Sequence, residues 1–223
     1  MALLSRSLLS LALVGLMSLL FTGCDVIDSD DEGLSAGTFA YTNPDGQEIT
    51  GEALYDLVDG SAVGVEDVPV NFFVIALLPN TDGADLAGEG ALLVRAAPLG
   101  APGPGNYSIG DAAPLLVDID PDNPPSFDEL QSFFSLYAQA TGGTPGAPEG
   151  TAAISRSGTV TLDAFGETAA GSFDFTAEPI DPATGELSGT TVQLQGQFNA
   201  RAGDIVEAIE DVLGGFPELP NGE

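Results

Sequence analysis

The chain has 223 residues and 43% of them are hydrophobic, which is enough for the core of one domain. It carries 34 acidic residues against four arginines and no lysine, and its formal net charge of −30 predicts repulsion of nucleic acids and anionic lipid headgroups. The acids are spread along the whole chain, which favours adaptation to high salt over one acidic binding patch. The absence of histidine and lysine excludes histidine-dependent triads, histidine-ligated metals and Schiff-base chemistry, so we expect a protein that is not an enzyme.

Residues 1–23 are typical of a secretory signal peptide. Arg6 supplies the charged start, an apolar run follows over residues 8–21, and Thr22 and Gly23 precede Cys24. The apolar run is shorter than the roughly 20 residues that a membrane-spanning helix needs, so we expect cleavage rather than a retained anchor.

The end of this segment, residues 20–24, resembles the lipobox of bacterial lipoproteins, with Phe21 where that family prefers leucine. The resemblance implies that Cys24 is lipidated, by acyl chains such as palmitate and a diglyceride, and becomes the mature N-terminus. The alternative is an ordinary cleaved signal beside an incidental cysteine. The single cysteine of the chain lies at the predicted cut, which favours lipidation and also excludes an intramolecular disulfide. We therefore expect a protein of the cell envelope, attached to a membrane and facing the periplasm or the cell surface.

Residues 24–36 are predicted to form a flexible acidic tether between the lipid and the folded part. The tether resembles the acidic tracts that send some lipoproteins to the cell surface. Asp25, directly after the cysteine, instead resembles a signal for retention in the inner membrane. Because these resemblances conflict, the sequence leaves the inner membrane, the outer membrane and the surface open.

Residues 37–202 are predicted to form an all-β domain. Short alternating or apolar runs, separated by turns rich in glycine, proline and aspartate, predict strands. The run at 71–78 is apolar throughout and predicts a strand that is buried on both faces. In the hairpin of 172–177 and 191–199, polar and apolar residues alternate, which predicts one buried face and one solvent-exposed face. The predicted strands are 37–42 (followed by a turn at 43–46), 48–57, 71–78, 91–97, 106–109, 159–162, 172–177 and 191–199.

This pattern favours an antiparallel β-sandwich or a barrel and does not separate the two. The runs 105–110, 157–162, 171–175 and 195–198 are similar to small all-β domains of unknown function on secreted lipoproteins of Gram-negative bacteria. That resemblance implies fold and location only. Residues 203–223 are predicted to form a short amphipathic helix, over 204–213, and a flexible tail.

A candidate calcium loop lies at residues 118–129. Its oxygen spacing resembles an EF-hand loop, although Asn123 replaces the glycine of the sharp turn and two prolines follow it. The alternative is a capping box, from Ser126 to Glu129, that opens a short helix ending near Phe133. The candidate ligands are Asp118, Asp120, Asp122 and Glu129.

These observations predict a lipid-anchored, non-enzymatic binding or structural module with an unknown protein or small-molecule partner. The first alternative is a lipocalin-like barrel that binds a small apolar ligand. The second is a hydrolase that uses a pair of carboxylates about 5–9 Å apart. The aromatic residues that would line the ligand chamber are Phe72, Phe73, Phe173, Phe175 and Phe198, which would otherwise form an ordinary core.

Overall fold

The computed structural model describes residues 34–59, 71–79, 87–97, 100–116, 131–144, 147–181, 184 and 186–205. The described part is all-β apart from the one-turn helix α2 (Ala113–Leu116). The strands are β1 (Thr38–Thr42), β2 (Glu48–Asp59), β3 (Asn71–Pro79), β4 (Ala87–Ala96), β5 (Gly105–Ile109), β6 (Phe134–Thr144), β7 (Ala147–Phe165), β8 (Thr168–Ile180) and β9 (Val192–Ala202).

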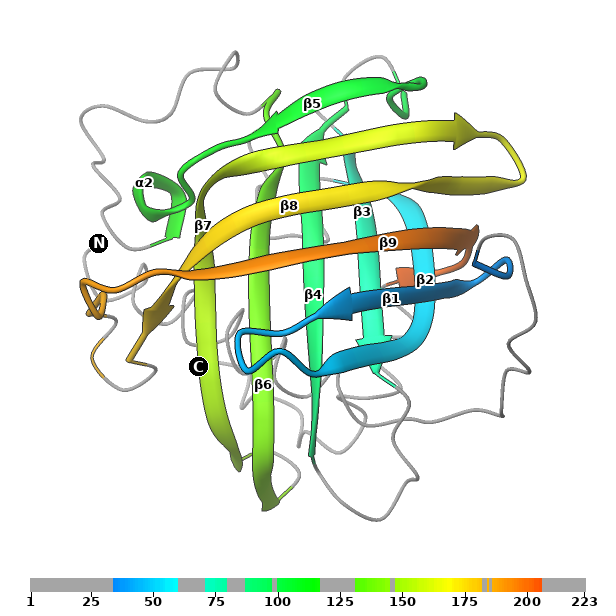
Figure 1. Cartoon of the computed structure of the whole chain (residues 1–223). Helices are drawn as coiled ribbons and strands as arrows, with labels where there is room; N and C mark the ends of the chain where they lie inside the picture. The colour runs from blue at the N-terminus through cyan, green and yellow to red at the C-terminus, as the bar shows by residue number, and fades with distance from the viewer. Residues whose placement is uncertain are drawn as a thin grey trace, which may run out of the picture.

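Eight of these strands close into an antiparallel barrel in the order β7-β6-β4-β3-β2-β1-β9-β8, with β8 pairing back to β7. The ninth, β5, pairs with the second half of β7, beyond the residues that pair with β6. Figure 1 shows a flattened barrel in which β3, β4 and β6 cross β1, β8 and β9 at a steep angle, while β2 and β7 bend from one layer into the other. Of the sandwich and the barrel, the chain forms the barrel.

Inward-facing apolar side chains form a buried core inside the barrel. Successive residues of a strand point to opposite faces, so every second residue contributes to this core. In β8, Phe173, Phe175 and Ala177 are buried, while Asp174 is exposed, as the sequence predicts. The largest side chains of the interior core are Phe39, Tyr41, Phe73, Ile75, Leu77, Leu93, Ile109, Phe133, Tyr137, Leu162, Phe173, Phe175, Leu194 and Phe198.

A second apolar cluster covers the outer face of β2, β3, β4, β6 and the first half of β7. It includes Phe72 and Val74 of β3, together with Ala113 of α2 and Ile205 beyond β9. Strand β3 therefore has buried side chains on both faces, which confirms the prediction from its continuous apolar run. The outward residues of β9, by contrast, are the exposed Gln193, Gln195 and Gln197, also as predicted.

Three glycines on inward positions make room for the aromatic core. Gly196 of β9 lies opposite Tyr41 on one side and Phe173 on the other. A Cβ atom at Gly196 would lie 2.3 Å from the Cβ of Tyr41, closer than real Cβ atoms approach each other. Gly158 and Gly171 lie opposite Phe175 and Phe198 in the same way. The glycine-and-aromatic pattern of the sequence is therefore a packing rule of this barrel.

Several predicted features lie outside the described residues. They are the signal peptide, Cys24, residues 24–33 of the tether, the calcium candidates Asp118, Asp120, Asp122 and Glu129, and residues 206–223 of the predicted C-terminal helix and tail. Ile205, the first apolar residue of that predicted helix, is described and is buried in the outer cluster. Among the described helices, none is long and apolar enough to cross a membrane.

Candidate functional site

A buried acid lies inside one end of the barrel. Glu89 is inward-facing on β4, in the same phase as Ala91 and Leu93, and only 7% of it is exposed. Its end of the barrel, here called the Glu89 end, is where β1, β3, β6 and β8 end and where β2, β4, β7 and β9 begin. An ionised carboxylate at such a position is costly unless several donors satisfy it.

Four neutral side chains donate to Glu89. The hydroxyl of Tyr137 donates to Oε2 at 2.8 Å, and the hydroxyl of Tyr41 makes a longer contact with the same oxygen at 3.5 Å. The amides of Asn43 and Gln139 each donate to Oε1 at 2.8 Å. Both carboxylate oxygens are therefore occupied, and the donors come from β1, the β1–β2 turn and β6.

The two tyrosines are held in their neutral form. Burial raises the pKa of Tyr41 far above its ordinary value. The negative charges of ionised Tyr137 and of Glu89 close by act in the same direction. Burial, followed by the hydrogen bond to Glu89, raises the pKa of Tyr137 in the same direction. Two protonated phenols and two amides thus stabilise one acid without any cation among the contacts that the structure describes.

Asn43 connects Glu89 to the β1–β2 turn. Its amide donates to Glu89, and its Oδ1 accepts from the backbone amides of Asp45 at 3.0 Å and Gln47 at 2.8 Å. Gly46 has φ of 78°, a left-handed conformation that glycine adopts without strain. The predicted turn at 43–46 is present, and the polar side chain at its first position fixes it to the barrel.

An open hollow of about 430 Å³ lies against this turn and the start of β9. Thr42 and Gln195, two of its lining residues, face each other across the β1–β9 pair. None of the lining residues carries a charge, so the hollow offers no carboxylate pair for hydrolysis. This rim hollow is lined by Thr42, Asn43, Pro44, Gly46, Thr191, Val192, Gln193 and Gln195.

The opposite end of the barrel contains a cation stacked on aromatic rings. The guanidinium of Arg95 lies 4.6 Å from the ring centroid of Tyr107 and 6.0 Å from that of Phe133. Its Nε also donates to the backbone carbonyl of Gln131. Arg95 therefore closes the space between the end of β4 and β5 by packing and a cation–π contact.

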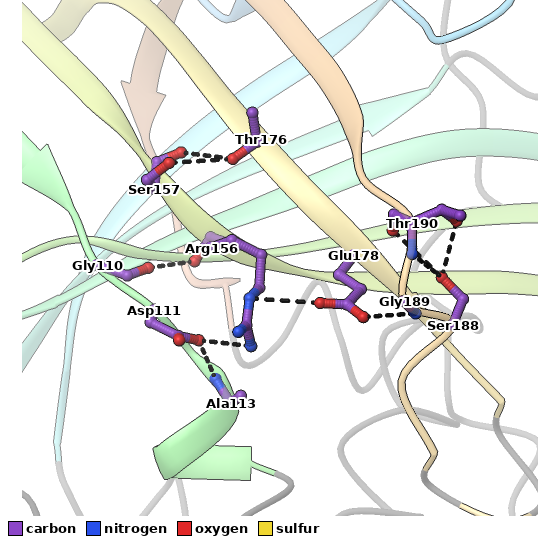
Figure 2. Close-up of polar contacts among 11 residues, drawn as sticks. Gly110, Asp111, Ala113, Arg156, Ser157, Thr176, Glu178, Ser188, Gly189 and Thr190 are labelled. Atoms are coloured by element: carbon purple, nitrogen blue, oxygen red, sulfur yellow. Dashed lines mark hydrogen bonds and ion pairs between the residues drawn. The ribbon is translucent and has the colours of Figure 1, made fainter.

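A third polar group lies on the outside of the barrel, at a bulge in β7 (Figure 2). Arg156 contacts Asp111 at 3.0 Å and Glu178 at 3.4 Å. Asp111 also accepts from the amide of Ala113, and Glu178 accepts from the amide of Gly189. One arginine thus ties α2 and the β8–β9 connection to the barrel wall, and this group is a structural clamp.

The aromatic residues predicted to line a chamber divide between the two clusters. Phe73, Phe173, Phe175 and Phe198 are in the interior core, as predicted. Phe72 is not, because neighbouring residues of a strand face opposite sides, and it lies in the outer cluster instead. The interior rings contact one another, with centroids of Phe173 and Phe175 5.7 Å apart. These rings are packed as a core.

Glu89 and its donors were not predicted from the sequence. The predicted strand began at residue 91, whereas β4 begins at Ala87 and places Glu89 in the inward phase. The sequence does contain one indication of this site. Glu89, Ala91 and Leu93 are alternate residues, so that they face the same side of a strand. The partners of Glu89 are distant in sequence, since Asn43 is 46 residues away.

Comparison with known proteins does not assign this site. No family model, no curated protein and no solved structure matches the chain. Among the described residues, no group of three or more acidic, histidine or cysteine side chains is arranged to hold a metal ion.

Proposed function

We propose that the chain is a lipid-anchored protein of the cell envelope whose barrel is a non-enzymatic binding or structural module in a salty medium. The observation that carries the proposal is that the described interior is packed with the barrel's own aromatic side chains. A barrel whose interior is packed with side chains has no room for a ligand or a reaction inside it. We therefore expect binding at the outer surface and at the ends of the barrel. The lipid at Cys24 and the acidic tether hold this surface away from the membrane.

The anchoring is tested by replacing the cysteine. Cys24→Ala removes the thiol that carries the lipid, and Ser29→Ala changes one hydroxyl of the same segment as a control. We expect the unchanged chain and the Ser29→Ala chain in the detergent-soluble membrane fraction, and the Cys24→Ala chain outside it. Equal membrane retention of all three would overturn lipid anchoring at Cys24.

The lipocalin-like alternative retains one specific observation in its favour. A closed eight-stranded antiparallel barrel is the architecture that encloses small apolar ligands in such proteins. The contacts between interior rings argue against it. The ring centroids of Phe73 and Phe133 are 6.3 Å apart, and those of Phe39 and Tyr41 are 5.5 Å apart. Titration of the barrel with a fluorescent fatty acid separates the two, since a filled interior predicts no saturable uptake. Saturable binding of one molecule per barrel would favour the ligand carrier.

A further inference from the structure

The rim hollow differs in chemistry from the rest of this protein. The chain carries 34 acidic residues, yet the eight residues that line the hollow are all uncharged. Asp45 of the β1–β2 connection and Glu48, the first residue of β2, lie close by in the chain but are not among those residues. An anion would be repelled by the net charge of −30, and a cation would find no carboxylate on the lining. The hollow therefore favours a neutral ligand.

Several residues that line the hollow have unused hydrogen-bonding groups. In the part of the chain that the structure describes, no hydrogen bond occupies the side chains of Thr42, Thr191 or Gln195. Gln193 uses one amide hydrogen on Asp174, at 2.9 Å, and keeps its remaining groups. Hydroxyls and primary amides both donate and accept, which matches a ligand rich in hydroxyl groups.

The hollow is also rigid and partly apolar. Asn43 uses its side chain on Glu89 and on two backbone amides of the turn, so that part of the wall is fixed before any ligand arrives. Pro44 and Val192 are the apolar members of the lining. A preformed wall lowers the ordering cost of binding. The hollow has a volume of about 430 Å³ and is open to solvent.

We propose that the rim hollow binds a neutral saccharide, with Thr42, Thr191 and Gln195 as hydrogen-bonding residues and the Glu89 cluster as the support that holds Asn43 in place. This inference names a ligand class for the binding role proposed above and rests on that role. It does not depend on the lipid, because the hollow is formed by β1, β9 and their connections.

Isothermal titration calorimetry tests the proposal on the lipidated chain, purified in a detergent without a sugar headgroup. The probes are glucose, N-acetylglucosamine and maltose, with glucuronate as the anionic comparison. We expect saturable heat from at least one neutral sugar and none from glucuronate. Gln195→Ala weakens that binding about tenfold or more, because a hydrogen-bonding partner is lost. Thr42→Val, a change of similar volume, weakens it in the same direction.

Gln197→Ala is the matched control, since Gln197 is an exposed glutamine on the same face of β9 and does not line the hollow. Its affinity should equal that of the unchanged chain. No saturable heat from any neutral sugar, equal binding of glucuronate, or an equal loss in Gln197→Ala would each overturn the proposal. Each of these outcomes leaves lipid anchoring untouched, because membrane fractionation of the Cys24→Ala chain reports on anchoring alone.

Discussion

At the scale of single residues, Glu89 shows how an acidic chain accommodates a carboxylate inside its barrel. The acid is matched by neutral donors, of which Tyr137, Asn43 and Gln139 are each 2.8 Å away. Each donor removed would leave part of a buried charge unsatisfied, at a cost of about 1–3 kcal/mol. The cluster couples β1, β4 and β6 at one end of the barrel, which is the end that carries the rim hollow.

The raised pKa values of Tyr41 and Tyr137 predict a loss of stability at alkaline pH. Below the ordinary tyrosine pKa of 10.0, both phenols are protonated in the folded and the unfolded chain, and their contribution is complete. Above that pH the unfolded chain loses the protons first. The free energy of unfolding then falls as pH rises, by up to about 1.4 kcal/mol per pH unit for each tyrosine. Urea unfolding at pH values from about 9 to about 11 measures the slope.

The double variant with Tyr41→Phe and Tyr137→Phe provides the comparison. It keeps both rings but has neither phenol, so its stability should depend far less on pH in this window. Lysine and histidine, absent from the chain, add no titration of their own there. The same slope in the variant and the unchanged chain would show that these phenols do not control alkaline unfolding.

At the scale of elements, the strand patterns predict local structure well and closure poorly. The alternation in β8 and β9 and the continuous apolar run of β3 predict faces that the structure has, because burial follows directly from side-chain direction. The barrel, however, closes where β1 pairs with β9, for example Thr38 with Asn199. No local pattern encodes a pairing between the two ends of the domain.

The candidate site was missed for a similar reason. Glu89 is identified as a site residue only by its hydrogen bonds from Asn43 and Tyr137. These donors come from other parts of the chain, and they approach Glu89 only in the folded barrel. The first half of β7, from Ala147, lacks large apolar residues before Ile154. The sequence predicts only residues 159–162, in the second half of β7, as strand. Long-range pairing supplies the rest of that 19-residue strand.

Gly196→Ala tests the packing rule of the β8–β9–β1 region. The added methyl group would lie 2.3 Å from the Cβ of Tyr41 and 2.6 Å from the backbone oxygen of Ala40, so a strand must shift. We expect a loss of about 1–3 kcal/mol in the free energy of unfolding. Gly166→Ala is the control, since nothing lies within 4 Å of a Cβ there, and it should change stability by less than about 0.5 kcal/mol. Equal effects would refute the close approach.

At the scale of the whole molecule, the negative charge is almost uncompensated. The three arginines of the described part are all engaged, with Arg95 on Tyr107, Arg156 on Asp111 and Glu178, and Arg201 on Glu52. The remaining acids repel one another over distances that salt controls. The screening length falls from about 10 Å at 0.1 M salt to about 3 Å at 1 M. The compact state is therefore expected to be most stable in concentrated salt.

Thermal unfolding in sodium chloride measures this dependence. We expect Tm to rise steeply as the salt concentration increases from about 0.1 M to about 1 M, because screening removes repulsion mainly from the folded chain. Sucrose at matched osmolality is the comparison, since it stabilises by exclusion from the surface and does not screen charge. A Tm that is insensitive to salt, or that rises equally in sucrose, would argue against charge repulsion as the limit on stability.

The central structural claim is that the barrel interior is a packed core, and Phe173→Ala tests it most directly. Phe173 is 3% exposed and contacts the rings of Tyr41 and Phe175. Leu57→Ala, at an apolar residue that is 40% exposed, is the control. Urea unfolding should show a loss of about 3–5 kcal/mol for Phe173→Ala and a much smaller loss for the control. A loss below about 1 kcal/mol for Phe173→Ala would mean that the ring faces an open chamber, and would contradict a filled barrel.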